Sequence, residues 1–199
     1  MQLLIKKFSN NKNGGAAIEF AFIAPIFILM FLGCFIAFDS LRAKRTIANS
    51  TIVISDLSTR LVEMNDLRID EIYNAADALL GIYSNAADLN YTVTSIVNPL
   101  GVDDDLAVVW SHSTDQNNEH TTADLVNFDL PEIGDGQTLI LVSTEGTYTP
   151  RFAPTFIKPT GLGVAFNTSE ISVRRPRLVR EICFRESVSN VTCSSNSSP

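Results

Sequence analysis

The chain has 199 residues, 45% of them hydrophobic, and a formal net charge of −7 at pH 7. An acidic exterior argues against a nucleic-acid partner and against binding to an anionic lipid surface. The 161 residues after Phe38 (199 less 38) are enough for one compact domain with its own hydrophobic core.

A long apolar helix is the first element that the sequence predicts. From Ala16 to Phe38 there are 23 residues, and Glu19 is the only charged residue among them. At 1.5 Å per residue this segment is about 34 Å long, enough to cross a hydrocarbon core of roughly 30 Å. A carboxylate inside such a segment costs roughly 2.5–3.5 kcal/mol on insertion scales. Glu19 is therefore the first candidate functional residue.

Three interpretations of this N-terminal segment compete. A plain signal anchor would keep Glu19 half-hydrated near the membrane interface. A cleaved secretory signal would use the lysines of residues 1–12 as its basic region, and a lipoprotein variant of it would acylate Cys34. A prepilin-type leader would be cut on the cytoplasmic side after a glycine, which leaves the apolar helix on the mature protein.

The spacing of residues favours the prepilin-type leader. The apolar run exceeds the 7–15 residues typical of a secretory signal, and it contains an acid. If the cut falls between Gly14 and Gly15, Glu19 becomes the fifth residue of the mature chain and Phe20 the sixth. A glycine at the cut, with a glutamate and an aromatic residue at these positions, is the recognition pattern of type IV-like pilins.

The apolar helix is predicted to continue beyond the membrane interface. Neither glycine nor proline occurs between Asp39 and Gly81, and residues 47–64 carry an alternating 4-3 pattern. That pattern predicts one seam along a helix. The seam packs either against the chain's own domain or against neighbouring subunits.

A second helix is predicted from Asp66 to about Asn85, with Asn65 or Asp66 as its cap. We expect its buried face to consist of Ile72, Ala75, Ala76, Leu79 and Tyr83.

The remaining elements are predicted to be strands. From Leu89 the apolar period changes to two, which is typical of a half-buried strand. Further strands are expected at 106–111, 138–148, 164–173 and 178–184, and Trp110 is expected in the core. Helices followed by a run of strands predict an α+β domain with an antiparallel sheet against the helices.

The three cysteines fall into two groups. Cys34 lies inside the apolar helix, where we expect inert packing. Cys183 and Cys193 flank a polar stretch that a turn could close, and an oxidised pair there would suit an extracytoplasmic domain. Two free thiols are the alternative.

Little in the chain predicts catalytic or metal chemistry. His112 and His120 lie in the polar stretch 111–123 with Asp115 and Glu119, and a solvated loop is the simpler expectation than a metal site. The sequence has no Walker A loop, nucleophile elbow or His-Glu-x-x-His motif. We therefore expect no enzyme, no cofactor and no metal site.

The leader and several later motifs resemble one family. Residues 14–25 read Gly-Gly-Ala-Ala-Ile-Glu-Phe-Ala-Phe-Ile-Ala-Pro. The later motifs are Val109-Trp110-Ser111, Tyr148-Thr149-Pro150-Arg151-Phe152, and Arg175-Pro176-Arg177 followed by Cys183. In this order they resemble the TadE/TadF-like pseudopilins of the tight-adherence (Flp pilus) secretion system. The resemblance covers most of the chain, with gaps at 112–137 and after Cys193.

The resemblance implies a pilin-like fold and a definite fate for the N-terminus. A prepilin peptidase would cut between Gly14 and Gly15, and Glu19 would neutralise the new ammonium of its own or a neighbouring chain. The implied partners are that peptidase, other pilins and pseudopilins, the inner-membrane platform of the Tad system and the lipid bilayer. The implied location is the bacterial inner membrane, with a cytoplasmic N-terminus and a periplasmic domain.

Two charged features have more than one interpretation. Asp56-Leu57-Ser58 is similar to the start of a von Willebrand-type metal motif in longer TadG-like relatives, but Arg60 stands where a second serine is expected. Five arginines between Arg174 and Arg185 either face an acidic partner or pair with local carboxylates across strands.

Together these expectations divide the chain into four parts. They are a basic leader at 1–14, a transmembrane helix at 15–38, an extracytoplasmic α+β domain at 39–193 and a disordered tail at 194–199. The expected function is that of a minor pseudopilin needed for pilus biogenesis, adhesion and biofilm formation. The alternative is a membrane-tethered or lipidated periplasmic binding or scaffold domain with no part in a pilus.

Overall fold

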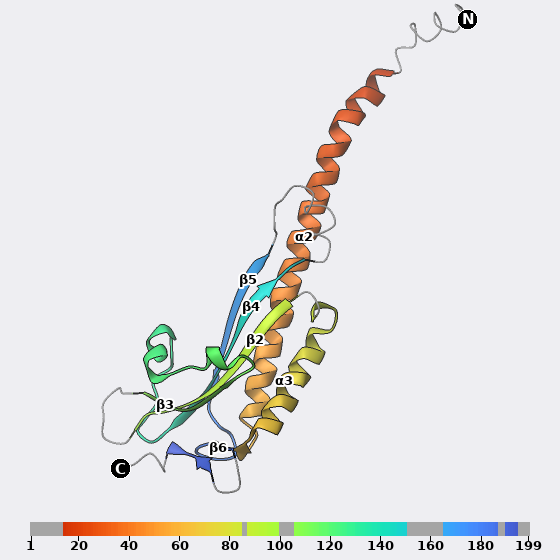
Figure 1. The fold of residues 1–199 in the computed structure, drawn as a ribbon. Coiled ribbons are helices and arrows are strands. Elements are labelled where there is room, and N and C mark those ends of the chain that lie inside the picture. The colour runs from red at the N-terminus through yellow and green to blue at the C-terminus, as the bar shows by residue number, and fades with distance from the viewer. Residues whose placement is uncertain (1–13, 85–86, 100–105, 151–164, 187–189, 195–199) are drawn as a thin grey trace, which may run out of the picture. The chain divides into compact units, whose positions relative to one another are not determined.

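The computed structural model describes residues 14–84, 87–99, 106–150, 165–186 and 190–194 (Figure 1). The chain forms two compact units, Met1–Asp39 and Ser40–Pro199. Its elements, in order, are α2 (Gly14–Ser58), β1 (Glu63–Met64), α3 (Asp66–Leu80), η1 (Gly81–Tyr83), β2 (Ala87–Val97), β3 (Ala107–Ser113), η2 (Gln116–Asn118), η3 (Thr122–Asn127), β4 (Thr138–Tyr148), β5 (Phe166–Arg174), β6 (Cys183–Arg185) and β7 (Val191–Thr192). The expected α+β class with a pilin-like arrangement is confirmed.

Within the second unit, α2 is buried along one side. Its buried residues recur at intervals of three and four: Ala43, Ile47, Ser50, Thr51, Ile54, Ser55 and Ser58. This stripe packs on the chain's own sheet, where Thr51 Oγ1 donates a hydrogen bond to Thr144 Oγ1 at 2.7 Å. The helix ends at Ser58, whereas the predicted seam extends to residue 64. Met64 is therefore not on the helix, and it packs into the core from β1.

The second helix, α3, has the predicted start and an earlier end. Asn65 Oδ1 accepts the backbone N–H of Arg68 at 2.9 Å, which satisfies an otherwise orphaned donor of the first turn. After Leu80, Gly81 takes a φ of 53°, a left-handed conformation that favours glycine. The chain therefore leaves the α-helix there and makes the single 3-10 turn η1.

The buried face of α3 differs from the predicted one. Its buried residues are Ile69, Ile72, Tyr73, Ala76 and Leu80. Ala75 is exposed and Leu79 is 50% exposed, so the prediction was wrong at both positions. The stripe turns toward Tyr73 because that ring stacks on Tyr91 of β2, with 5.8 Å between ring centroids.

Four strands form an antiparallel sheet in the order β3-β2-β4-β5. The central pair is long, and β2 faces β4 from Ala87↔Tyr148 to Val97↔Thr138. The expected strand at 178–184 is wrong, because only Cys183–Arg185 forms a strand, parallel to β1 and antiparallel to β7. Before it, backbone groups bond outside any ladder, as Arg177 N–H does to the carbonyl of Thr59.

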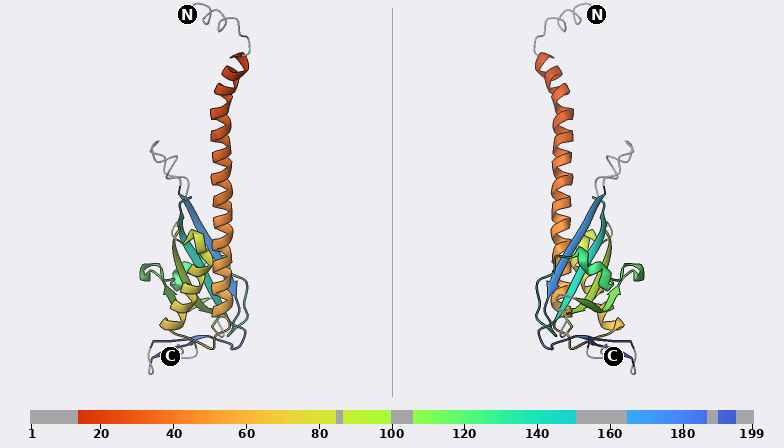
Figure 2. Two further views of the ribbon diagram at one scale, coloured as in Figure 1. Left: turned by 90° about the vertical axis from the view of Figure 1, so that its right-hand side faces the viewer. Right: turned by 90° about the vertical axis from the view of Figure 1, so that its left-hand side faces the viewer.

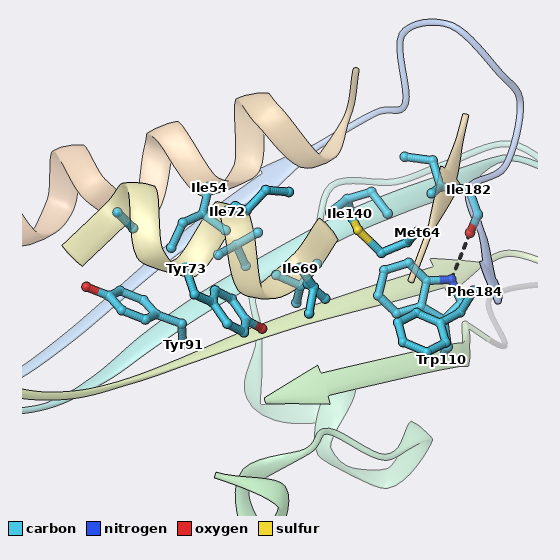
Figure 3. Packing of buried hydrophobic residues seen from close by; sticks show 13 residues of the cluster. Ile54, Met64, Ile69, Ile72, Tyr73, Tyr91, Trp110, Ile140, Ile182 and Phe184 are labelled. Atoms are coloured by element: carbon cyan, nitrogen blue, oxygen red, sulfur yellow. Dashed lines mark hydrogen bonds between the residues drawn. The ribbon is translucent and has the colours of Figure 1, made fainter. Parts of the chain in front are cut away.

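The sheet has a core on each face. The face under α2 and α3 carries the larger core, which includes Ile54, Ile72, Tyr73, Val93 and Val142 (Figure 3). The other face is covered by the segment between β3 and β4, which contains η2 and η3 (Figure 2). Its core consists of Ile96, Leu125, Ile133, Leu139 and Leu141.

Trp110 joins the small C-terminal sheet to the large one. Its indole Nε1–H donates to the carbonyl of Ile182 at 2.7 Å, and its ring lies 5.3 Å from that of Phe184 (Figure 3). The expectation of a core tryptophan is confirmed, since Trp110 is 6% exposed. The disulfide between Cys183 and Cys193 closes the same C-terminal segment.

Gly146 should be intolerant of any side chain. A Cβ at this position would overlap the backbone of Asp88 and Leu89 on the paired strand β2. Because backbone in a central ladder cannot move aside, we expect Gly146→Ala to lower the free energy of unfolding by about 1–3 kcal/mol. Urea unfolding of the full chain in detergent, followed by the fluorescence of its single tryptophan, measures this.

Gly134→Ala is the matched control, because a Cβ there meets only the Gln137 side chain at ordinary contact distances. We expect a change within about 0.5 kcal/mol for it. Equal effects of the two substitutions would contradict the close approach of β2 and β4 at Gly146.

Candidate functional site

The predicted processing site lies at the start of α2. Gly14 is the first residue of the helix, and Gly15 is exposed in its first turn. Glu19 and Phe20 follow in the same helix and are both exposed, Phe20 by 71%. The lysines of the expected leader lie outside the described residues, and cleavage itself stays a prediction.

The N-terminal part of α2 exposes an apolar surface. Large side chains from Ile18 to Phe38 are mostly exposed, and no residue of the most apolar 18-residue window is buried. A core helix of a soluble protein would bury one side of such a segment. A contiguous exposed apolar surface of this kind marks a membrane or protein contact. By length and composition, this helix fits a membrane anchor or a signal sequence.

Glu19 lies one helical turn after Gly15. Residues four apart in a helix share a face, so the Glu19 carboxylate and the main-chain nitrogen of Gly15 belong to the same side of α2. Within the described part of the chain, Glu19 makes no ion pair. A cut after Gly14 would place an ammonium at the position that suits this carboxylate.

A second charged cluster surrounds Asp56, and the sequence did not predict it. The Asp56 carboxylate accepts from Arg60 at 2.6 Å, from Arg174 at 3.3 Å and from Arg177 at 2.6 Å. Arg60 lies one turn further on α2, and the two other arginines come from the end of β5 and the segment after it. The spacing of Asp56 and Arg60 could have indicated that pair, whereas no local pattern links Asp56 to residues 118 and 121 positions away.

This cluster settles the interpretation of Asp56. A carboxylate enclosed by three guanidinium groups is not a cation ligand, so the similarity to a metal motif does not describe its role. Three arginines of the basic cluster pair with carboxylates of the described residues. Arg174 and Arg177 pair with Asp56 of α2 and not with a carboxylate across a strand. Arg185 of β6 pairs with Glu63 of the neighbouring strand β1, as the cross-strand expectation has it.

The two histidines lie on opposite faces of the sheet. His112 packs against Tyr73 and Phe184 on the α3 side, and its Nε2 is 3.8 Å from an oxygen of Asp66. His120 Nε2 is 2.7 Å from Ser143 Oγ on the other face, beside the ring of Phe128. The structure therefore does not bring the histidines together as metal ligands.

His120 and Ser143 do not form a usable nucleophile. Burial lowers the pKa of the His120 imidazole, although the carboxylates of Asp124 and Glu145 act in the opposite direction. A neutral imidazole beside a serine hydroxyl is the geometry of a general base. Ser143, however, is only 2% exposed, so no substrate reaches its Oγ, and the pair serves to satisfy a buried hydroxyl.

The cysteines are placed as two separate features. Cys183 and Cys193 form the expected disulfide, with 4.7 Å between their Cα atoms. Glu181 lies beside their sulfurs, but sulfurs in a disulfide are not the thiolates that bind metals. Cys34 is a free cysteine exposed on the apolar part of α2, and its inert packing stays a prediction.

Comparison of the chain with protein-family models, with curated proteins and with solved structures finds no match.

The Asp56 cluster should contribute measurably to stability. Asp56→Asn removes the charge that three guanidinium groups share, and hydrogen bonds to charged groups contribute about 1.5–3 kcal/mol. Since the cluster is partly exposed, we expect a loss of about 1–2 kcal/mol in the free energy of unfolding. Urea unfolding at fixed ionic strength measures it.

Glu170→Gln is the control for this substitution. It removes a pair with Lys44, whose atoms are 3.7 Å apart and whose lysine is 63% exposed. An exposed pair of this kind contributes at most about 1 kcal/mol. If Asp56→Asn lowers the free energy of unfolding no more than Glu170→Gln does, the cluster does not stabilise the fold as its geometry indicates.

Protonation of His120 should weaken the fold below neutral pH. Its lowered native pKa means that the unfolded chain, with a histidine pKa of about 6.5, binds more protons in this range. Stability from this residue is therefore complete above about pH 6.5 and is lost as the pH falls toward the native pKa. We expect urea midpoints between pH 8 and 5 to fall less in His120→Gln than in the wild type.

The carboxyl group of Asp124 does not disturb this measurement. Hydrogen bonds from Thr121 lower the pKa of Asp124, so its stabilising contribution is lost only in more acidic solution. Parallel pH profiles of the wild type and His120→Gln would show that His120 titrates alike in the folded and unfolded chains.

Proposed function

We propose that this chain is a minor pseudopilin of the TadE/TadF-like kind in a tight-adherence (Flp) pilus system. The observation that carries the proposal is that the two parts of α2 differ in character. Its first part is apolar and exposed with one carboxylate near the start, and its second part is the core helix of an α+β domain. A pilin needs both parts in one helix, because the same element anchors the subunit and organises its globular domain.

The proposed location is the bacterial inner membrane, with the N-terminus in the cytoplasm and the domain in the periplasm. The apolar part of α2 supports a membrane anchor by its length and its exposure. The Cys183–Cys193 disulfide indicates an extracytoplasmic domain, because disulfides persist in oxidising compartments. The opposite location of the N-terminus follows from a single crossing.

The proposed role of Glu19 is to pair with the ammonium that processing creates at Gly15. Two opposite charges about 4 Å apart attract by about 4 kcal/mol at an effective dielectric constant of 20. Removing one partner of a buried pair commonly costs about 3–5 kcal/mol. An energy of this size is enough to decide whether a subunit leaves the bilayer for an assembly.

In this proposal the chain is the substrate of an enzyme and not an enzyme itself. A prepilin peptidase cuts it after Gly14, and other pilins or pseudopilins and the inner-membrane platform are its assembly partners. The chain serves pilus biogenesis, and through it adhesion and biofilm formation.

The mature N-terminus tests the proposal directly. Intact mass and N-terminal sequence of the protein recovered from its native membrane should show a chain that begins at Gly15. A chain that begins at Met1, or a lipidated chain that begins at Cys34, would replace the pseudopilin with a membrane-tethered periplasmic domain. A chain that begins close to Asp39 would identify the apolar segment as a secretory signal.

Substitution of Glu19 tests the charge pair. Glu19→Ala should leave membrane insertion intact. It should block processing if the peptidase needs this carboxylate in its recognition pattern, or else block pilus formation, because the new ammonium loses its partner. Membrane fractionation, the mass of the recovered chain and counts of pili measure the three steps separately. Glu19→Asp, which keeps the charge, should retain more function, and normal piliation in Glu19→Ala would refute the pairing.

A further inference from the structure

Four exposed apolar side chains gather at one end of the Ser40–Pro199 unit. Leu41 is 61% exposed, Leu79 50%, Ile82 56% and Phe166 41%. They come from α2, α3, η1 and β5, which are distant in sequence. We call these four residues the apolar rim.

Contacts beneath the rim show that its members share one end of the unit. A small buried cluster contains Ala43, Ile47, Leu80, Tyr83 and Tyr148. Leu41 is two residues before this cluster on α2, and Leu79 and Ile82 each adjoin one of its members in sequence. Phe166 pairs with Tyr148 across the ladder between β4 and β5. Figure 1 shows the end of α3, the end of β4 and the start of β5 at this end of the unit.

The rim lies at the end of the unit where the chain enters it. The unit begins at Ser40, and Leu41 is three residues after Phe38, the last residue of the apolar segment. At 1.5 Å per helical residue, three residues advance by about 4.5 Å. If the apolar segment spans a bilayer, Leu41 therefore lies at the depth of the lipid headgroups.

We propose that the apolar rim inserts into the phospholipid interface, so that the domain rests on the membrane that anchors it. This inference depends on the membrane anchor of the proposed function, and it adds a second contact made by the domain itself. Exposed leucine, isoleucine and phenylalanine side chains are the groups that interfacial elements bury at the boundary of headgroups and acyl chains. The α3–η1 tip presents two of them, Leu79 and Ile82, within four residues.

Charge decides which lipid surface fits. Arg42 and Arg45 are exposed in the turn that follows Leu41, and long basic side chains reach lipid phosphates while their stems stay on apolar groups. Asp77 and Asp88 are also exposed at this end, and they would be repelled by an anionic surface. The occupant is therefore a zwitterionic phospholipid interface, held by apolar insertion and not by net charge.

Site-directed spin labelling of the full chain in phosphatidylcholine vesicles tests the inference. Nitroxides are placed one at a time at Leu79→Cys and Ile82→Cys in a Cys34→Ser background, because Cys34 is the free cysteine of the described residues. Collisions with dissolved oxygen report contact with lipid, and collisions with a water-soluble nickel chelate report contact with solvent. We expect a severalfold higher ratio of oxygen to nickel collisions at both positions than at the control position.

Val126→Cys is the control, because Val126 is 90% exposed on η3 and its neighbour Leu125 packs with Ile96 and Leu139 at the opposite end of the sheet. All labelled positions are exposed, so the substitutions leave the core intact, and tryptophan fluorescence verifies folding.

Leu29→Cys, within the apolar segment, separates this inference from the proposed function. A label at Leu29 that reads as aqueous would show that the segment is not inserted, and both proposals would fail. Lipid contact at Leu29 with aqueous labels at 79 and 82 would overturn only the interfacial rim. Labels at 79 and 82 shielded from both reagents would also overturn it, because a protein surface would then cover the rim.

Discussion

One helix must satisfy two solvents, and the rest of the structure depends on that constraint. Up to Phe38, α2 exposes large apolar side chains, as a membrane anchor or a signal sequence does. From Ala43 it is amphipathic, and one stripe is buried against a sheet. The change falls between Phe38 and Ala43, less than two helical turns, and neither glycine nor proline interrupts the backbone there. The sheet therefore packs on the amphipathic part of one continuous helix.

The composition of the buried stripe explains how the sheet fits that helix. Apart from Ala43, Ile47 and Ile54, the stripe consists of serine and threonine, whose small side chains allow the helix and strands to approach closely. Two of their hydroxyl groups have partners in this interface: Thr51 bonds to Thr144, and Ser50 donates to the carbonyl of Ile47. The hydroxyl groups of Ser55 and Ser58 are buried without a hydrogen-bond partner among the described residues. Asp56 then joins the last turns of α2 to Arg174 of β5 and to Arg177. Apolar packing and charged hydrogen bonds thus act at successive positions along the same helix.

The sequence predicts correctly those helices and strands that have a regular apolar period. It fails where contacts between residues far apart in the sequence determine the structure. The alternation from Leu89 and the run at 138–148 predict β2 and β4, because a half-buried strand must alternate. Residues 178–182 also include apolar side chains, but they form no strand. The carbonyl of Ile182 accepts from the Trp110 indole, and just before this segment the Arg177 N–H donates to the carbonyl of Thr59. The buried face of α3 depends on Tyr91 across the sheet. The glycine-glutamate motif at residues 14–20 is contiguous, so the sequence alone reveals it. The Asp56 cluster joins residues more than 100 positions apart, so only the folded chain reveals it.

The proposed processing site is separate from the hydrophobic core. Gly14, Gly15 and Glu19 lie in the first compact unit, and every buried hydrophobic residue of the described chain lies in the second, from Ala43 onward. The cut of the proposed function falls well before Ala43, so it removes no residue of that core. We therefore expect the proposed processing to create a charge at the start of α2 and to leave the stability of the domain unchanged.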